Sequence, residues 1–409
     1  MLNKILTRFI FVFVTLFIIS VPFPHPFMPD IAGWLHPFFE GLVKWTGTHI
    51  LHIQHPYTTR LVSDSTGLYI HVFILSILSI IIASAWIISE KANSNYEKVF
   101  YWFTIVISYY LALQLFDYGF NKIFKWQFYL PEPNTLYSTL GNTHRDLLYW
   151  STMGLSRPYT IFAGTTEIIA AVLLLFKRTR LAGALFASIV LTNVIAINFC
   201  YDISVKIFSC FLLLLCMVII APHASRLFTF FFDAKNSRGK KDTITTGTTK
   251  TNWLYVIIKA GVVVYMLFST LYVYFNENNF NDDKAARPKF HGAYDVVTFV
   301  NNGDTLPPLL TDTTRWKRVF VHRRGYLITQ DMNDNMQDYV LVTDTVKHHF
   351  IIEREDDKKE FVLNYFQSPD STLHLSGIID NNNLFITLKA IDISRLPALQ
   401  NEFNWTIDN

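Results

Sequence analysis

Long apolar segments constrain this chain more than any other feature. Their lengths reach, or nearly reach, what a helix needs to cross a hydrocarbon core about 30 Å thick. The segments are residues 5–22, 67–89, 99–118, 158–177, 180–199, 203–222 and 253–275. We therefore expect an α-helical polytopic membrane bundle with one span for each segment.

The first segment combines features of a signal peptide and of an anchor. Lys4 and Arg8 precede an apolar run, as they would in a secretory signal. The run is followed by PFPHPF, however, and not by a small-residue cleavage site. We therefore expect an uncleaved membrane anchor.

The charges of the connecting loops predict the orientation, because cytoplasmic loops carry an excess of Lys and Arg. Basic residues recur in every second loop: Lys4, Arg8, Lys91, Lys98, Lys177, Arg178, Arg180, Arg226, Lys235, Arg238, Lys240 and Lys241. The loop 119–157 on the opposite side also carries basic residues, but the large basic loop 223–252 outweighs it. We expect a bacterial inner-membrane protein with a cytoplasmic N-terminus and a periplasmic or extracellular C-terminal domain.

The C-terminal third has the pattern of a small all-β domain. After the polar linker 276–290, eight short runs alternate apolar and polar residues between connectors such as NNGD, MNDN and DNNN. This period of two predicts an antiparallel meander. Eight strands in so short a segment suit a closed barrel or a sandwich. Arg315 with Trp316, and Trp405, are expected to close one end of it.

These patterns predict the domain organisation. We expect N-terminal membrane helices with an outer loop, a four-helix membrane core, a basic cytoplasmic loop, a last transmembrane helix, a linker and an extracytoplasmic β domain. In that order they cover residues 1–98, 99–222, 223–252, 253–275, 276–290 and 291–409.

Composition excludes several classes of function. A net charge of +3 and the absence of a basic, aromatic-rich stretch argue against a nucleic-acid partner. The three cysteines, Cys200, Cys210 and Cys216, form no CxxC pair, so a disulfide framework or a zinc site is not expected. The C-terminal domain has no P-loop, HExxH, GxSxG or dinucleotide motif, which argues against catalysis there.

The membrane core resembles the DoxX family, small bundles of membrane helices. The resemblance rests on a YG-x-x-K element, a QF-x-x-P element, an MG-x-S element and an NF-x-YD-x-x-VK element. Here these are Tyr118–Lys122, Gln127–Pro131, Met153–Ser156 and Asn198–Lys206. The resemblance implies quinone-coupled or thiol-related redox chemistry, with a quinone as the possible cofactor, and action beside partner subunits.

Polar residues within this core are the candidate site, because ionisable groups at membrane depth are costly unless paired or solvated. The candidates are Asp117, Lys122, Gln127, Glu167, Asn198, Asp202 and Lys206. Glu167 shares a helix face with Gly164 and should point into the bundle. It either carries a proton or binds a quinone carbonyl, or it pairs with Lys122 or Lys206 and locks the bundle.

The other candidates also allow two interpretations. Lys122 continues a polar stripe through Asp117, which either binds a head group or solvates the helix end. Asp202 and Lys206 have the favourable i, i+4 order and are expected to pin a helix hairpin. Alternatively, Asn198, Asp202, Glu167 and Lys122 converge on one cavity that faces outward.

The first loop contains His49, His52 and His55, which on one helix would cover an arc of about 120°. This spacing allows a metal site, but no acidic or cysteine partner lies nearby. The segment FFEGLVKWTGTHILHI instead reads as an amphipathic helix at the membrane interface.

Two functions remain open from the sequence. One is a redox-associated membrane protein whose bundle binds a quinone or lipid-like molecule and whose β domain docks a partner or a small ligand. The other is a non-enzymatic scaffold or envelope-assembly factor. Membrane lipid and a protein partner are expected in both, and whether the chain is an enzyme stays undecided. A transporter is disfavoured, because no inverted repeat or pair of broken helices is evident.

Overall fold

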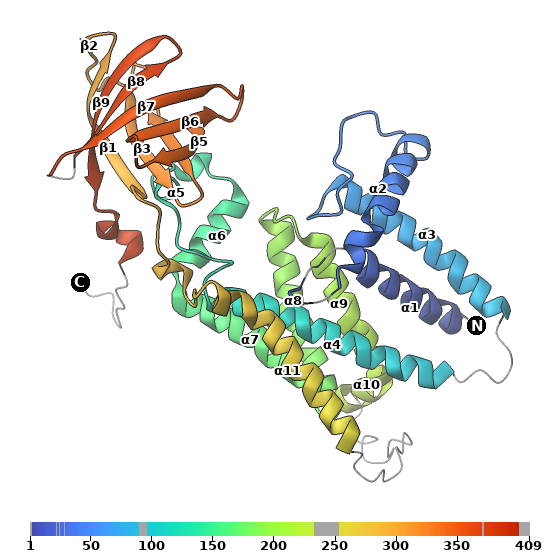
Figure 1. Ribbon diagram of the computed structural model, residues 1–409. Helices are drawn as coiled ribbons and strands as arrows, with labels where there is room; N and C mark the ends of the chain where they lie inside the picture. The colour runs from blue at the N-terminus through green and yellow to red at the C-terminus, as the bar shows by residue number, and fades with distance from the viewer. Residues whose placement is uncertain are drawn as a thin grey trace. The chain divides into compact units, whose positions relative to one another are not determined.

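The computed structural model describes residues 2–21, 23, 25–27, 29–89, 96–232, 253–369 and 372–400. The chain divides into two compact units (Figure 1). The helical unit contains Met1–Gln127 and Pro158–Phe280, and the barrel unit contains Phe128–Arg157 and Asn281–Asn409. Trp405 and the basic residues between 233 and 252 lie outside the described residues.

The helical unit consists of long apolar helices. They are α1 (Leu2–Ser20), α2 (Ile31–His49), α3 (Thr66–Ser89), α4 (Tyr96–Ile123), α7 (Arg157–Leu175), α8 (Arg180–Cys200), α9 (Lys206–Ile220), α10 (Ala224–Phe232) and α11 (Trp253–Asn276). Over the described residues, six helical segments are long and apolar enough to cross a membrane, which makes the chain a multi-pass membrane protein. They match all of the predicted spans except the first.

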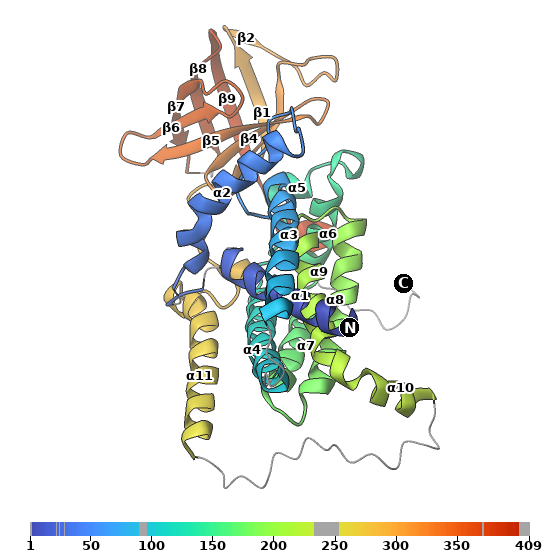
Figure 2. The ribbon, with the colours of Figure 1, turned by 90° about the vertical axis from the view of Figure 1, so that its right-hand side faces the viewer.

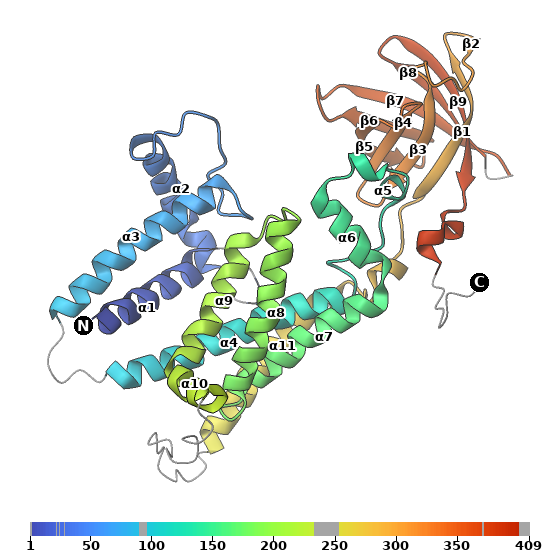
Figure 3. The same ribbon diagram turned by 180° about the vertical axis from the view of Figure 1, so that it is seen from behind.

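The first predicted span is a shorter apolar helix. Its described apolar part is Ile5–Ser20. At about 1.5 Å of rise per residue this part is shorter than a core about 30 Å thick. α1 nevertheless packs along α3, as the views in Figures 1 and 3 agree. Val14 and Phe17 of α1 are fully buried in the common core of the unit.

α2 is the amphipathic helix that the sequence predicts. Phe39 and Val43 are buried on one face, while Trp34, Phe38 and Trp45 are exposed. The helix ends at His49, so His52 and His55 lie beyond it. The helical arc of three histidines is therefore not formed, because the chain leaves the helix before the second of them.

The predicted basic loop after α9 begins with more helix. A short 3-10 turn at Ala221–His223 contains Pro222 and leads into α10. Proline removes a backbone donor and bends a helix. Figure 2 shows α10 turning away from α9 after this point.

The barrel unit contains a closed antiparallel barrel. Its strands are β1 (Gly292–Asn301), β3 (Trp316–His322), β4 (Tyr326–Asp331), β5 (Met336–Asp344), β6 (His349–Arg354), β7 (Glu360–Gln367), β8 (Leu373–Ile379) and β9 (Asn382–Ile391). Each strand pairs with the next, and β1 pairs with β9 to close the ring. All eight predicted strands are confirmed, and the domain is a barrel and not a sandwich. A two-residue strand, β2 (Asp304–Thr305), adds to β1.

Side chains fill the barrel interior. The inward residues form one apolar cluster that includes Phe299, Phe350, Leu363 and Ile386, all almost fully buried. Arg315 is also buried, and it donates hydrogen bonds to the carbonyl oxygens of Leu306, Trp316 and Val296. Trp316 packs on Phe299, with ring centroids 5.7 Å apart. Arg315 and Trp316 thus both pack within the barrel, and the interior is a packed core; their closure of one end stays a prediction.

The segment Phe128–Arg157 lies between α4 and α7 in the sequence but folds with the barrel. We call it the inserted segment. It contains α5 (Pro133–Leu136), a 3-10 turn (Leu140–Asn142) and α6 (Arg145–Leu155). A Cβ at Gly154 would lie 2.2 Å from the carbonyl oxygen of Tyr129, so glycine allows α6 to pack directly on the irregular start of the segment. The sequence predicted only an outer loop here.

Candidate functional site

Lys122 of α4 and Glu167 of α7 form a buried ion pair. The Lys122 Nζ lies 2.8 Å from both carboxylate oxygens of Glu167. The two side chains are only 9% and 4% exposed. A buried charge is strongly destabilising without a partner, so each of these groups requires the other. The contact is the pairing alternative of the sequence analysis, and it links two helices of the core.

Two glycines bring α4 and α7 to this distance. A Cβ at Gly164 would lie 2.5 Å from the carbonyl oxygen of Gly119, and a Cβ at Gly119 would lie 2.9 Å from that of Gly164. Small residues let membrane helices approach backbone to backbone. Lys122 follows Gly119 by one turn and Glu167 follows Gly164 by one turn. The glycine contact therefore positions the ion pair.

Asp117 and Gln127 lie near this pair in the sequence but make other contacts. The Asn121 side-chain amide donates to the backbone oxygen of Asp117 at 2.9 Å and to its carboxylate at 3.4 Å. The backbone N–H of Gln127 donates to the Asn121 oxygen at 3.1 Å. The Gln127 side-chain oxygen is buried and has no hydrogen-bond partner in the described part of the chain.

Asn198, Asp202 and Lys206 stabilise the turn between α8 and α9. Lys206 donates from Nζ to Asp202 at 2.8 Å, as the i, i+4 spacing predicts. Asn198 donates to the Ser209 hydroxyl at 3.1 Å. Asp64, which the sequence analysis missed, accepts the backbone N–H groups of Lys206 and Ile207 at 2.8 and 3.0 Å. Asp64 precedes α3 in the sequence, a position that suggests a helix cap, but the helix that it caps is α9.

The structure thus places the predicted residues in separate groups. Lys122 is joined to Glu167, Asp202 to Lys206, and Asn198 to Ser209. Asp117 and Gln127 both form hydrogen bonds with Asn121. Each group has a packing role that its own contacts explain.

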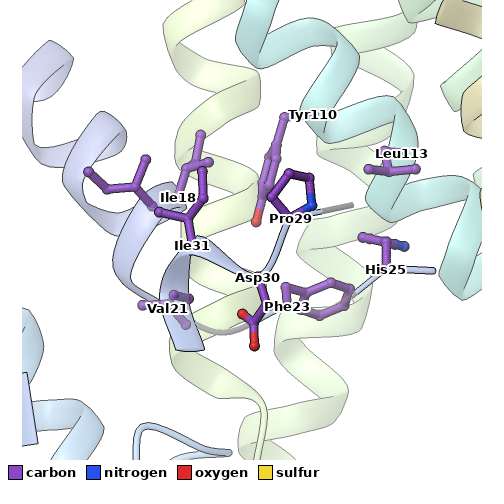
Figure 4. A pocket seen from close by; sticks show the side chains of 11 residues that line it. Ile18, Val21, Phe23, His25, Pro29, Asp30, Ile31, Tyr110 and Leu113 are labelled. Atoms are coloured by element: carbon purple, nitrogen blue, oxygen red, sulfur yellow. The ribbon is translucent and has the colours of Figure 1, made fainter. Parts of the chain in front are cut away.

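A cavity of about 200 Å³ lies elsewhere in the helical unit, between α1, the start of α2 and α4 (Figure 4). Its wall is mainly apolar, with His25, Asp30 and Tyr110 as the polar members. Asp30 caps α2 by accepting the Gly33 N–H at 2.8 Å. The His25 ring lies 3.4 Å from the Gln114 side-chain nitrogen. His25 and Tyr110 are then the polar side chains that a small molecule in the cavity would meet.

In the barrel unit, Glu132 of the inserted segment is the centre of a polar cluster. One carboxylate oxygen lies 3.0 Å from Arg323 Nε. The other accepts the Arg323 backbone N–H at 3.2 Å and the His291 Nε2 proton at 3.0 Å. His322 Nε2 lies 3.8 Å away. Glu132 is only 4% exposed, so the inserted segment places a buried carboxylate against the barrel.

The electrostatics of this cluster favour an ionised Glu132. Burial raises the pKa of the carboxyl, but the His291 hydrogen bond and the Arg323 backbone N–H are among the contacts that outweigh it, and the pKa is lowered. The pKa of His322 is lowered mainly by burial. His322 also accepts the Arg324 backbone N–H through Nδ1 at 3.0 Å. The cluster is therefore a carboxylate held by Arg323 and His291, beside a His322 whose neutral form is favoured.

Further contacts fix the inserted segment to the barrel. The Arg323 guanidinium lies over the Tyr129 ring at 3.5 Å, and the Arg318 guanidinium lies over the Tyr137 ring at 4.5 Å. The Leu130 N–H donates to Asp283 at 2.8 Å. These contacts could not be predicted from sequence spacing, because the two residues of each pair are more than 150 positions apart. Leu130 and Asp283, for example, are separated by 153 positions.

Comparisons with known proteins add a family relationship and no activity. No protein-family model matches the sequence, and no solved structure matches it significantly. The chain is similar to a protein described as uncharacterized, YwoB of Bacillus subtilis (strain 168). The two are 34% identical over 111 residues, which cover 27% of this chain and 70% of YwoB.

Proposed function

The chain belongs to the same family as YwoB of Bacillus subtilis, and from this premise we propose that it is a non-enzymatic scaffold of the bacterial inner membrane. In this proposal the helical unit is the anchor and the barrel unit docks another protein of the cell envelope. The N-terminus is cytoplasmic and the barrel is periplasmic or extracellular, in accord with the basic loops.

The observation that carries this proposal is an apolar row on the outside of a barrel whose interior is already filled. Val342 and Ile351 are opposite each other across β5 and β6, and Ile351 is opposite Val362 on β7. Val342, Val362 and Ile378 of β8 are 57%, 44% and 60% exposed. Because exposed apolar patches mark interaction sites, and the barrel interior is filled by a buried apolar cluster, we assign binding to this outer face.

Glu132 supports the same proposal. A docking domain needs a stable attachment to the rest of its chain. The inserted segment is bound to the barrel through the buried Glu132 carboxylate, which His291 and Arg323 contact. Charge-assisted hydrogen bonds of this kind are stronger and more directional than neutral ones. The barrel is thereby joined to the chain between α4 and α7 as well as through the linker before β1.

A photo-crosslinking experiment in intact cells tests the proposal. A photoreactive residue at Val362 or Ile378 should give one discrete cross-linked envelope protein, and Val342→Glu should abolish it, because a charge cannot be buried in an apolar contact. The same residue at Lys389, an exposed polar position on β9, is the matched control and should give none. Equal cross-linking at all three positions, or none at any, would contradict the docking face.

A second candidate function follows the DoxX resemblance, in which the helical unit binds a quinone or a lipid-like molecule in a redox system. The cavity beside His25 and Tyr110 is the observation that favours it. An apolar cavity of about 150 Å³ in another protein holds benzene, so this one is large enough for a single substituted ring. An imidazole N–H and a phenol O–H are suitable donors to a ring carbonyl.

This candidate is tested by quinone binding and quinone-linked turnover in purified membranes. Tyr110→Phe should weaken quinone binding, whereas Lys122→Met and Glu167→Gln should do so only if the buried ion pair takes part. If all three variants bind quinone and turn over like the wild type, these residues are not the quinone site. A wild type that neither binds quinone nor turns over excludes the redox function in favour of the scaffold.

A further inference from the structure

A second cavity in the helical unit is a groove of about 320 Å³ between the α1–α3 pair and α9. Its wall is almost entirely apolar and includes Phe13, Phe17, Val72, Phe199, Phe211 and Leu214. α3, α8 and α9 belong to segments that are long and apolar enough to cross a membrane. The groove therefore opens between membrane helices, where the medium that reaches it is lipid.

The inner wall of the groove is buried and its rim is exposed. Phe17 and Phe211 stack with ring centroids 3.9 Å apart, and Phe17 is only 1% exposed. Phe199 and Tyr69 on the rim are 58% and 52% exposed. Water enters a cavity readily only where it finds several polar partners, which this wall does not supply. A hydrocarbon chain has the size and polarity that the groove accepts.

Both signs of charge lie where the groove meets the N-terminal end of α9. Lys206 lines the groove, and its Nζ lies 2.8 Å from Asp202 and 3.8 Å from Asp64. The Asp202 side chain is 84% exposed, while that of Lys206 is 17% exposed. Asp64 is already occupied by the backbone N–H groups of Lys206 and Ile207. The groove therefore presents an ammonium group close to its wall and a carboxylate farther into solvent.

We propose that this groove binds a zwitterionic aminophospholipid, with one acyl chain along the aromatic wall, the phosphate at Lys206 and the lipid ammonium at Asp202. Lys206 and Asp202 match the two charges of such a head group in order, since the phosphate lies nearer the acyl chains than the ammonium. A singly anionic lipid would face Asp202 without a counter-charge. This site is independent of the scaffold proposal, because it uses only the helical unit.

Native mass spectrometry of the full chain, released from nanodiscs of equal parts phosphatidylethanolamine, phosphatidylglycerol and phosphatidylcholine, tests the site. The wild type should retain phosphatidylethanolamine over phosphatidylglycerol by about fivefold, the ratio given by one exposed charge pair worth about 1 kcal/mol. Asp202→Asn should remove most of that preference while tail binding persists. Leu214→Trp, which fills the groove, should lower retention of all three lipids.

The controls separate the site from general lipid contact. Ile189→Trp changes a 69% exposed position of α8 outside the groove and should leave lipid retention unchanged. Asp202→Asn alters an exposed side chain and keeps the test decisive if Leu214→Trp fails to fold. Retained lipid that follows the nanodisc composition in the wild type, or an unchanged preference in Asp202→Asn, overturns the proposal.

Discussion

Glu132 and Glu167 are both buried carboxylates, and each is held by nitrogen groups from a distant part of the chain. Glu167 was predicted to matter because it interrupts an apolar run, where a charge stands out. Glu132 lies between two prolines in the loop sequence LPEP, outside any long apolar run, where a glutamate is unremarkable. At the scale of single residues, the sequence reveals a buried charge only when its neighbours in sequence are apolar.

Breaking one half of the Lys122–Glu167 pair should cost more than removing both. Glu167→Gln leaves a buried ammonium without its counter-charge, and we expect a loss of about 3–5 kcal/mol in unfolding free energy. The double variant Lys122→Met with Glu167→Gln should recover a large part of this loss. Thermal unfolding in detergent measures both. A double variant as unstable as the single one would show that the pair is not the reason for the loss.

The stability of the barrel unit should fall as the pH drops below about 6.5. The folded-state pKa of His322 is lowered from 6.5, so below that pH the unfolded chain binds the proton more tightly and folding is disfavoured. The pKa of Glu132 is lowered from 4.5, so its contribution is complete above that value and is lost as the pH falls through the lower folded-state pKa.

Chemical denaturation followed by Trp fluorescence between pH 8 and 4 measures this dependence. His322→Gln should flatten the upper part of the curve, and Glu132→Gln should reduce stability at neutral pH and flatten the acid part. Stability that rises on acidification in the wild type would contradict the assignment.

At the scale of helices and strands, close approach is decided by a few small residues. Gly119 and Gly164 let α4 and α7 touch, whereas Gly261 of α11 has no atom within 4 Å of the position of a Cβ. All three are glycines within apolar helices, and the sequence alone does not separate them. Only the packing partner distinguishes a required glycine from a tolerated one.

Gly164→Ala should therefore destabilise the helical unit, and Gly261→Ala should not. The added methyl at position 164 meets the Gly119 carbonyl, so α4 and α7 must separate and stretch the ion pair. We expect a cost of about 1–3 kcal/mol, as for other overpacked sites. Alanine at position 261 should be neutral or stabilise by up to about 1 kcal/mol through helix propensity. Thermal unfolding of both variants under one condition decides the comparison.

Most elements could be predicted from the sequence, because their periodicities are local properties. Six spans, the amphipathic α2 and eight barrel strands follow from apolar runs and from the alternation of apolar and polar residues. α5 and α6 could not be predicted, because they are short, contain no long apolar run and fold with a distant part of the chain. Asp64 was missed because the backbone N–H groups that it accepts, at the start of α9, are 142 and 143 residues away in the chain.

At the scale of the whole molecule, the division into units does not follow the order of the chain. The barrel unit takes one segment from between α4 and α7 and another from the C-terminal part. The chain therefore passes between the units at three points. A sequence reading that cuts the chain into consecutive domains assigns the inserted segment to the bundle, since hydropathy says nothing of where a polar loop folds.

The proposed orientation is tested by cysteine labelling in intact cells. In a background with Cys200, Cys210 and Cys216 replaced by serine, Val346→Cys at an 88% exposed barrel position should react with a membrane-impermeant maleimide. Ser225→Cys in α10 should react only after the membrane is permeabilised. The reverse pattern would place the barrel in the cytoplasm and refute the orientation.

The inserted segment can form its contacts with the barrel only late in synthesis, because the barrel strands follow it in the chain. Residues 128–157 emerge from the ribosome well before strand β9, which must pair with β1 to close the barrel. Until then Glu132 lacks His291 and Arg323, and Tyr129 lacks the guanidinium that covers it. Four more candidate spans follow the segment in the chain and are synthesised before the barrel strands. We expect the segment to be more sensitive to proteases during that interval than after the barrel has closed.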